Sequence, residues 1–296
     1  METPQGSGRR QWLRFAVVAP VLRAFNAVAA GAAGEDVKTW SRTFEVHARI
    51  SLFNMPLFSK SGVGGGVIMV EESRCGAERR TALQLCAGSW PGRLKGFNRF
   101  GLTQELVREL QPRTVESSYL SFMTTSTEKS FSEARRSYLE TAEASTFSVA
   151  HGHSTPGRSE AGLERLNADR KLDWRRSAEL AAEFRRRLAP MRPVEHGGGP
   201  ESAAGTFLHA VRTAVLADRA ETRQPFLHLG KQYTLDARKR VSGPTVELTG
   251  QIHERTGAGR SEFRIWCDAG DPSAIPYRIE FRAKSYLHLV FESATP

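Results

Sequence analysis

Strict alternation of apolar and polar residues runs through both ends of this chain. Residues 39–52 read TWSRTFEVHARISL, and residues 277–284 read YRIEFRAK. In each stretch the apolar side chains recur at every second position, with charged side chains between them. A period of two residues is typical of a β-strand that buries one face and leaves the other in water. The pattern therefore predicts antiparallel sheet at both ends of the chain.

Further strands are predicted between these ends and beside them. Residues 62–73, 79–88 and 114–125 are short apolar-rich runs, and the first two form an antiparallel meander with residues 39–52. Toward the C-terminus, turn residues separate a succession of similar runs. These are residues 226–241 with a turn at Gly230 and Lys231, followed by 245–252, 261–267, 276–284 and 286–292.

The middle of the chain has helical spacing instead. Residues 130–144, 173–190 and 203–216 carry apolar side chains three and four positions apart, which predicts helices. We therefore expect an α+β fold, in which a curved antiparallel sheet, a partial or half β-barrel, packs around one or more helices. Residues 33–296 would form a single β-rich domain, with a mainly helical middle segment at 130–216.

The N-terminus has the order of a secretory signal peptide. The positive cluster of Arg9, Arg10 and Arg14 precedes the apolar run 15–22, and the small-residue tract 27–34 follows. This order is typical of a signal peptide, and the apolar run is shorter than the roughly 20 residues of a membrane-spanning helix. No later stretch is apolar enough to cross a membrane. An amphipathic N-terminal helix of a cytosolic protein is the alternative.

We expect residues 1–32 to be the signal peptide and the protein to be periplasmic or secreted. Cleavage after Ala29 or Ala32 would complete an A-x-A pattern. The sequence RRQWL, which begins at Arg9, also resembles a twin-arginine export signal. Removing this segment deletes four arginines and one glutamate, which lowers the net charge from +10 to +7. That charge alone does not predict a nucleic-acid partner.

The three cysteines suggest one disulfide and one thiol in an oxidising compartment. Cys75 and Cys86 flank a predicted hairpin, so they are the expected pair, and Cys267 would remain reduced. Their spacing does not fit a zinc site. His151 and His153 share one face of a strand without a nearby carboxylate, so we predict neither a metal nor a cofactor.

Ser154 is the one candidate nucleophile. It lies in the sequence GHSTPG, one residue away from the G-x-S-x-G turn that presents the catalytic serine of many esterases. Pro156 replaces the last glycine, and the strand-rich surroundings do not fit the parallel sheet of that enzyme class. A serine hydrolase is therefore an alternative hypothesis. Acids and histidines that could complete a triad are Asp236, Asp268, His253 and His288.

A group of arginines in the middle segment forms a second alternative site. Arg185, Arg186 and Arg187 end the helix predicted at 173–190, and Arg192 follows shortly after it. Clustered arginines can bind an anionic envelope polymer, although such a run is also typical of a solvated helix face. The corresponding hypothesis is a polyanion-binding interaction module.

Three segments of the C-terminal hundred residues form a distinctive pattern: TFLHAVRTAVL, HLGKQYTLDARKR and FRIWCDAGDPSAIPYRIEFRAK. This pattern resembles a bacterial envelope family of unknown function. The resemblance implies an exported protein whose curved antiparallel sheet wraps round a helix, similar to the half-barrel of lipoprotein-carrier proteins. It brings no catalytic motif with it.

The leading hypothesis from the sequence is an exported, non-enzymatic envelope protein that binds a lipid or other apolar ligand on a curved sheet. A curved sheet with an apolar face can hold a helix and still leave a groove for an acyl chain. The alternative is that this face is only the protein core. The candidate lining residues are Phe263, Ile265, Tyr277, Ile279 and Phe281.

Overall fold

A computed structural model describes most of the chain from residue 36 onward. The described residues are 36–52, 55–89, 100–110, 114–124, 145–168, 191–194, 205–228, 231–254, 260–284 and 287–293. The predicted signal peptide, residues 1–32, lies outside them. So do the helices predicted at 130–144 and 173–190.

The described residues form one sheet of 15 strands, made of two meanders. The N-terminal meander runs in sequence order from β1 to β8, each strand beside the next. Its strands are β1 (Lys38–Leu52), β2 (Met55–Cys75), β3 (Glu78–Ser89), β4 (Phe100–Leu110), β5 (Thr114–Thr124), β6 (Ser145–Thr155), β7 (Arg158–Ala168) and β8 (Arg192–Pro193).

The C-terminal meander contains the remaining strands and the one described helix. Its elements are β9 (Gly205–Thr206), α5 (Phe207–Leu216), β10 (Glu221–His228), β11 (Lys231–Ser242), β12 (Thr245–Glu254), β13 (Arg260–Asp268), β14 (Arg278–Lys284) and β15 (Leu287–Ser293). Neighbouring strands are antiparallel, except that β9 pairs in parallel with β10.

The two meanders join where the first and last strands meet. β1 pairs with β15 in antiparallel register, with Val46 opposite Phe291 and Ala48 opposite Leu289. Phe44, Val46 and Ala48 are all buried, whereas Glu45 and Arg49 are exposed. The two-residue rhythm of the sequence therefore fixes which face of β1 is buried, as expected for a strand with one wet face.

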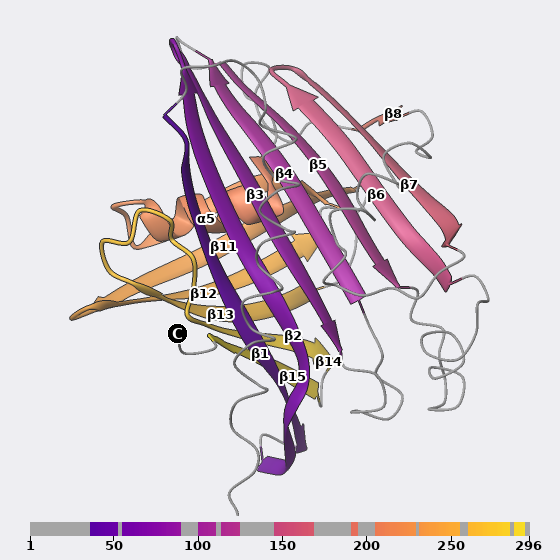
Figure 1. Ribbon diagram of the computed structural model, residues 1–296, viewed down its shortest axis with the longest axis vertical. Helices are drawn as coiled ribbons and strands as arrows, with labels where there is room; N and C mark the ends of the chain where they lie inside the picture. The colour runs from indigo at the N-terminus through magenta and orange to yellow at the C-terminus, as the bar shows by residue number, and fades with distance from the viewer. Residues whose placement is uncertain are drawn as a thin grey trace, which may run out of the picture.

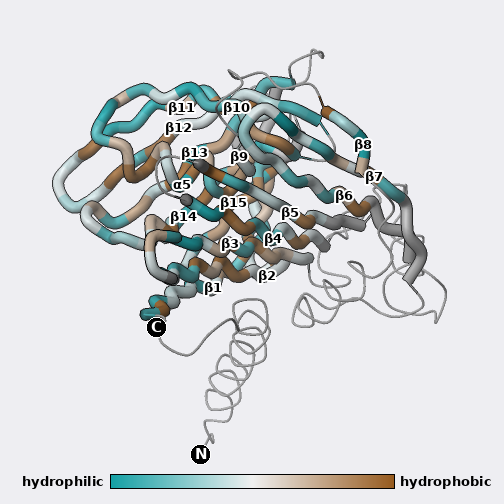
Figure 2. Tube along the Cα trace, turned by 90° about the horizontal axis from the view of Figure 1, so that it is seen from above, coloured by the Kyte–Doolittle hydropathy of each residue, from teal (hydrophilic) through white to brown (hydrophobic). Residues whose placement is uncertain are grey.

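The sheet rolls over so that its C-terminal strands face its N-terminal ones. In Figure 1 the indigo and magenta strands β1–β7 cross the orange and yellow strands β11–β15, and α5 lies between the two sets. Figure 2 shows the same arrangement from above, with α5 inside the curled sheet. Leu227 of β10 packs against Tyr119 of β5 and Ala150 of β6, which brings the free edge of the C-terminal meander onto the N-terminal one.

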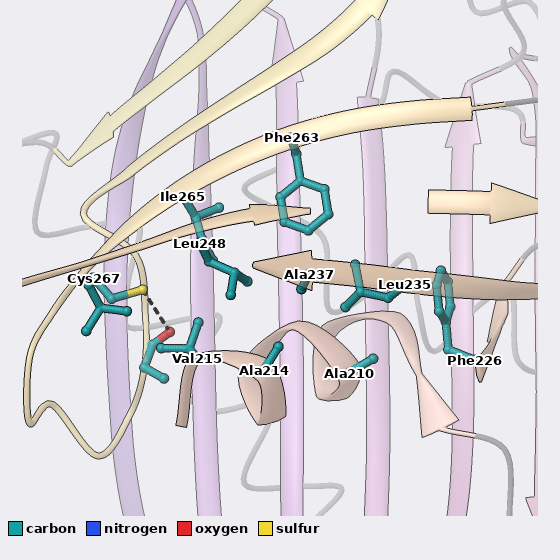
Figure 3. Close-up of a cluster of buried hydrophobic side chains, with 12 residues drawn as sticks. Ala210, Ala214, Val215, Phe226, Leu235, Ala237, Leu248, Phe263, Ile265 and Cys267 are labelled. Atoms are coloured by element: carbon teal, nitrogen blue, oxygen red, sulfur yellow. Dashed lines mark hydrogen bonds between the residues drawn. The ribbon is translucent and has the colours of Figure 1, made fainter. Parts of the chain in front are cut away.

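The largest apolar cluster lies between α5 and the C-terminal strands. Ala210, Ala214 and Val215 of the helix point toward strands β10–β13 (Figure 3). Small alanine side chains on the helix let it approach the sheet closely, so the larger side chains come from the strands. Those side chains include Phe226, Leu235, Leu248, Phe263 and Ile265.

The α+β prediction is wrong. The described residues are nearly all strand with a single ten-residue helix, and a parallel strand pair makes the sheet mixed. The mainly helical segment predicted at 130–216 contains, at residues 145–168, the hairpin of β6 and β7. Several buried positions of this hairpin are polar, namely His151, Ser154 and Ser159, so its sequence does not show the clear apolar alternation of a half-buried strand.

The predicted disulfide between Cys75 and Cys86 is also wrong. Cys75 lies opposite Glu78 in the β2–β3 hairpin, whereas Cys86 lies opposite Val67. Cys86 is thus eight residues along β3 from the position facing Cys75, about 26 Å at the rise of a strand. A disulfide requires Cα atoms within about 7 Å of each other. Cys86 and Cys267 are buried thiols rather than halves of a disulfide.

Candidate functional site

An apolar cavity of about 270 Å³ lies between the two meanders, beside α5. Strands β2 and β3 form one wall with Ile68, Met69, Val70, Leu83, Leu85 and Ala87. The opposite wall comes from β12–β15 and includes Ile252, Phe263, Ile265, Ile279, Phe281 and Phe291. The cavity volume is near the lower end of the range for small-molecule sites, roughly 300–1,000 Å³.

The helix and one loop complete the cavity. Phe207, Leu208 and Val211 line it from α5, and the loop between β13 and β14 adds Ala274, Ile275 and Pro276. The polar residues that reach the lining are Gln84, Arg212 and Ser273. Such a surface favours a ligand with a large apolar part and few polar groups.

Four of the five lining residues predicted from the sequence are in the cavity wall. Phe263 and Ile265 of β13 and Ile279 and Phe281 of β14 all contribute to it. Tyr277 does not line the cavity; it lies just before β14, and its backbone N–H donates to the carbonyl of Trp266 at 2.8 Å. Whether the other four contact a ligand stays a prediction.

Arg212 lines the cavity and ties the two meanders together. Its side chain is only 9% exposed. The Nε group donates to the Ser273 carbonyl at 3.0 Å, and Nη2 donates to the Pro272 carbonyl and to Glu72 Oε1. Burial alone would raise the pKa of Glu72, but the charges and hydrogen bonds of Arg212 and Arg79 hold it below the usual range. The pair is therefore a charged link from α5 to β2.

A second polar link runs in the other direction, from β4 to the start of α5. Thr206, the N-cap residue, makes no capping hydrogen bond with its side chain. The carboxylate of Glu105 accepts instead from the backbone N–H groups of Leu208 at 2.8 Å and His209 at 2.9 Å. A carboxylate here satisfies helix N–H groups that have no partner in the helix, and the helix dipole favours its charge.

Burial nevertheless shifts the titration of several groups around α5. Glu105 is 3% exposed, and desolvation raises its pKa to about 7 despite the hydrogen bonds from the helix. Burial likewise lowers the pKa of His209 and of His228 to about 4. All three side chains are therefore predominantly uncharged at mildly acidic pH.

Ser154 has none of the surroundings of a catalytic serine. It lies within β6, is fully buried, and its hydroxyl is 2.7 Å from that of Ser159 on β7. The turn that follows is Pro156–Gly157, and Gly157 has the positive φ of 75° that a type II turn requires at this position. The turn leads into another strand rather than a helix. Asp236 on β11 and His253 on β12 pair with each other, with 3.3 Å between the carboxylate oxygen and the imidazole Nε2.

The other predicted groups contribute little to the site. Arg185, Arg186 and Arg187 lie outside the described residues, and Arg192 is an exposed residue of β8. Burial raises the pKa of the Cys267 thiol to about 12, which suppresses the nucleophilic thiolate.

In the described part of the chain, no group of three or more metal-binding side chains comes together. No helix among these residues is long and apolar enough to cross a bilayer.

Sequence reasoning missed the β2–β3 wall, Arg212 and Glu105. Each depends on contacts between segments far apart in the chain: Arg212 and Glu72 are 140 residues apart, and Glu105 and Leu208 are 103 residues apart. The only local signal was a charged residue in an apolar pattern: Arg212 in TFLHAVRTAVL and Glu105 in LTQELV. A buried charge at such a position needs a partner, but spacing does not identify it.

Comparisons with known proteins give a distant structural match and no family. No family model matches the chain, and no curated protein matches it significantly. A similar solved structure is the crystal structure of a β-barrel-like protein of a domain of unknown function, DUF1849, from Brucella abortus. It is 7% identical, with a TM-score of 0.40 over 86% of this chain and 95% of that chain. This likeness transfers no function.

Proposed function

We propose that this protein binds an apolar ligand, such as an acyl chain, in the cavity between the two meanders. The observation that carries the proposal is the composition of the cavity wall, which is apolar except at Gln84, Arg212 and Ser273. A cavity with such walls is poorly hydrated, so an apolar ligand gains from leaving water without displacing well-bound solvent.

The polar links around the cavity favour a binding site with a fixed shape. Glu105 anchors the start of α5, and the amino group of Lys239 donates to the carbonyls of Val215 and Ala217 at its other end. A helix fixed at both ends gives the cavity a permanent wall. Preformed walls reduce the ordering cost of binding.

The role in the cell follows from the predicted signal peptide. An exported protein that holds an acyl chain would carry or sense an envelope lipid without chemical change. The buried hydroxyl of Ser154 gives no support to the hydrolase alternative. Of the four arginines named in the polyanion-binding hypothesis, only Arg192 lies among the described residues, where it is exposed.

The test is ligand capture by two matched variants. Native mass spectrometry of protein purified from the envelope should show an added mass, and the delipidated protein should take up a fluorescent fatty acid. Val211→Trp fills the cavity from α5 and should lower uptake at least tenfold. Leu216→Trp places the same side chain at an exposed position of the same helix and should bind normally. Failure of the wild type to bind any apolar probe would exclude the proposal.

A further inference from the structure

The inner face of the β2–β3 hairpin changes character along its length. Near the middle of the hairpin this face is apolar, and it packs against Ile275 and Leu208. Toward the hairpin turn it becomes charged. Its residues along β2 are Ile68, Val70, Glu72 and Arg74, and their partners across the strand pair are Leu85, Leu83, Thr81 and Arg79.

A polar recess of about 320 Å³ lies over the charged part of this face. It is lined by Asp36, Lys38, Glu72, Ser73, Arg74 and Arg79. Lys38 enters the recess from β1, where it lies directly opposite Glu72. The recess therefore lies on β1, β2 and β3, and β2 and β3 also form one wall of the cavity.

Arg212 lies where the cavity and the recess meet. Its side chain lines the apolar cavity, and its Nη2 donates at 2.5 Å to Glu72, which lines the recess. The apolar volume and the polar volume are thus neighbours, separated by one ion pair. A ligand that extends from the cavity past this pair would place its end among the charges of the recess.

Cationic side chains outnumber anionic ones in the recess, with Lys38, Arg74 and Arg79 against Asp36 and Glu72. Glu72 is already engaged by Arg79 at 3.0 Å and by Arg212, so its negative charge is compensated. Lys38 and Arg74 are exposed, and neither forms an ion pair with another residue in the described part of the chain. Arg74 faces Arg79 directly across the hairpin. Like charges opposite each other are unfavourable, and a bound anion would relieve that repulsion.

We infer that the ligand is a single-chain amphiphile with an anionic head group. Its chain lies in the apolar cavity, and its carboxylate or phosphate lies in the recess beside Lys38 and Arg74. This inference rests on the proposed function, because it assigns the head group of a ligand whose chain occupies the cavity. Hydrogen bonds between a cationic side chain and an anion are about twice as strong as neutral ones.

The experiment compares head groups on one chain. Dodecyl phosphate, dodecanol and dodecyltrimethylammonium, each below its micelle concentration, compete with the neutral fluorophore phenylnaphthylamine for the full-length mature protein. We expect dodecyl phosphate to bind roughly ten- to a hundredfold more tightly than dodecanol and the cationic amphiphile to bind most weakly. Inorganic phosphate, followed by calorimetry, should bind far more weakly than dodecyl phosphate.

Two double variants test which side chains cause the preference for the anionic head group. Lys38→Gln with Arg74→Gln should abolish the preference for dodecyl phosphate and leave dodecanol affinity unchanged. Arg238→Gln with Arg240→Gln removes the same charge from exposed positions on β11 and should preserve the preference.

Equal affinity for all three head groups would overturn the inference while leaving the proposed function intact. So would a preference that survives loss of Lys38 and Arg74, or tight binding of inorganic phosphate alone. Failure of every amphiphile and of the fluorophore to bind would instead refute the proposed function.

Discussion

The two meanders bury different kinds of side chain. The C-terminal strands pack apolar residues onto α5, with Phe226, Leu235 and Leu248 almost fully buried. The N-terminal strands also bury polar side chains, which pair across neighbouring strands. Examples are Gln84 with Gln104, Thr103 with Ser121, and Ser154 with Ser159. One meander is thus stabilised mainly by apolar burial, whereas the other adds directional hydrogen bonds that fix strand register.

Two polar links, one from each meander, hold the meanders together. Arg212 of α5 reaches Glu72 of β2, and Glu105 of β4 reaches the start of α5. Both links border the cavity or its helix, so the boundary between the two regions is also the candidate site.

The largest expected effect is the loss of the Arg212 link. Arg212→Leu leaves the buried carbonyl of Ser273 and the carbonyl of Pro272 without this donor, and Glu72 with Arg79 as its one remaining cation. Removing one partner of a buried pair typically costs about 3–5 kcal/mol, and we expect the free energy of unfolding to fall by that order in urea titrations. Arg223→Gln removes an exposed arginine that pairs with Asp236 and should cost under about 1 kcal/mol. Equal effects from the two variants would contradict the account.

The Glu105 link should be visible in the pH dependence of stability. The pKa of Glu105 is about 7 in the fold against an ordinary value of 4.5, so the folded protein retains a proton that the unfolded chain releases. This residue therefore lowers stability as pH rises from 4.5 to 7. His209 and His228 act oppositely, because their lowered pKa values make stability rise between pH 4 and 6.5.

Glu105→Gln removes the contribution of Glu105 to the pH dependence of stability, which opposes that of the two histidines. The free energy of unfolding of the variant should rise more steeply with pH than that of the wild type. The difference between the two proteins should change by an amount on the order of 3 kcal/mol across pH 4.5 to 7. Glu109→Gln removes a carboxylate at a more exposed position on the same strand and is the matched control for the loss of a side-chain charge from β4. Parallel pH profiles for wild type and Glu105→Gln would refute the shifted pKa.

Sequence patterns predicted local strands better than they predicted the site. Period-two alternation located β1, β13 and β14 because each buries one face, and it placed Phe263 and Phe281 on the face that lines the cavity. The hairpin at 145–168 escaped because Ser154, Ser159 and His151 are buried polar residues. The α+β assignment failed because helical spacing over short segments does not reveal how much of a chain is strand.

One structural feature is common to both meanders and should respond similarly in both. Gly152 lies beneath the ring of Tyr119, and Gly250 lies beneath the ring of Phe263, each in a cross-strand pair. A Cβ at either glycine would come within 2.2 Å of the ring. Gly152→Ala and Gly250→Ala should therefore each lower the free energy of unfolding by about 1–3 kcal/mol. Gly243 is a turn glycine with a positive φ and no other atoms near the position of a Cβ. Gly243→Ser therefore introduces backbone strain without any contact with a ring, and it serves as the comparison for the two ring-contact variants.

The smallest expected effect concerns Ser154. Ser154→Ala removes one hydroxyl from a buried pair and leaves Ser159 with one partner fewer, so thermal unfolding should report a loss of about 1 kcal/mol. Binding of an apolar probe should not change, because Ser154 is not in the cavity wall. Ester turnover by the wild type that disappears in this variant would contradict the structural role.

The central claim, that the cavity holds an apolar ligand, can be tested through the isoleucines. The chain has six, and Ile68, Ile252, Ile265, Ile275 and Ile279 all line the cavity, whereas Ile50 does not. Methyl NMR of protein labelled only at isoleucine can follow each of them during a titration with dodecanol. We predict that the five cavity methyl signals shift together and saturate while that of Ile50 stays in place. Unchanged spectra at saturating ligand, or a shift confined to Ile50, would contradict the claim.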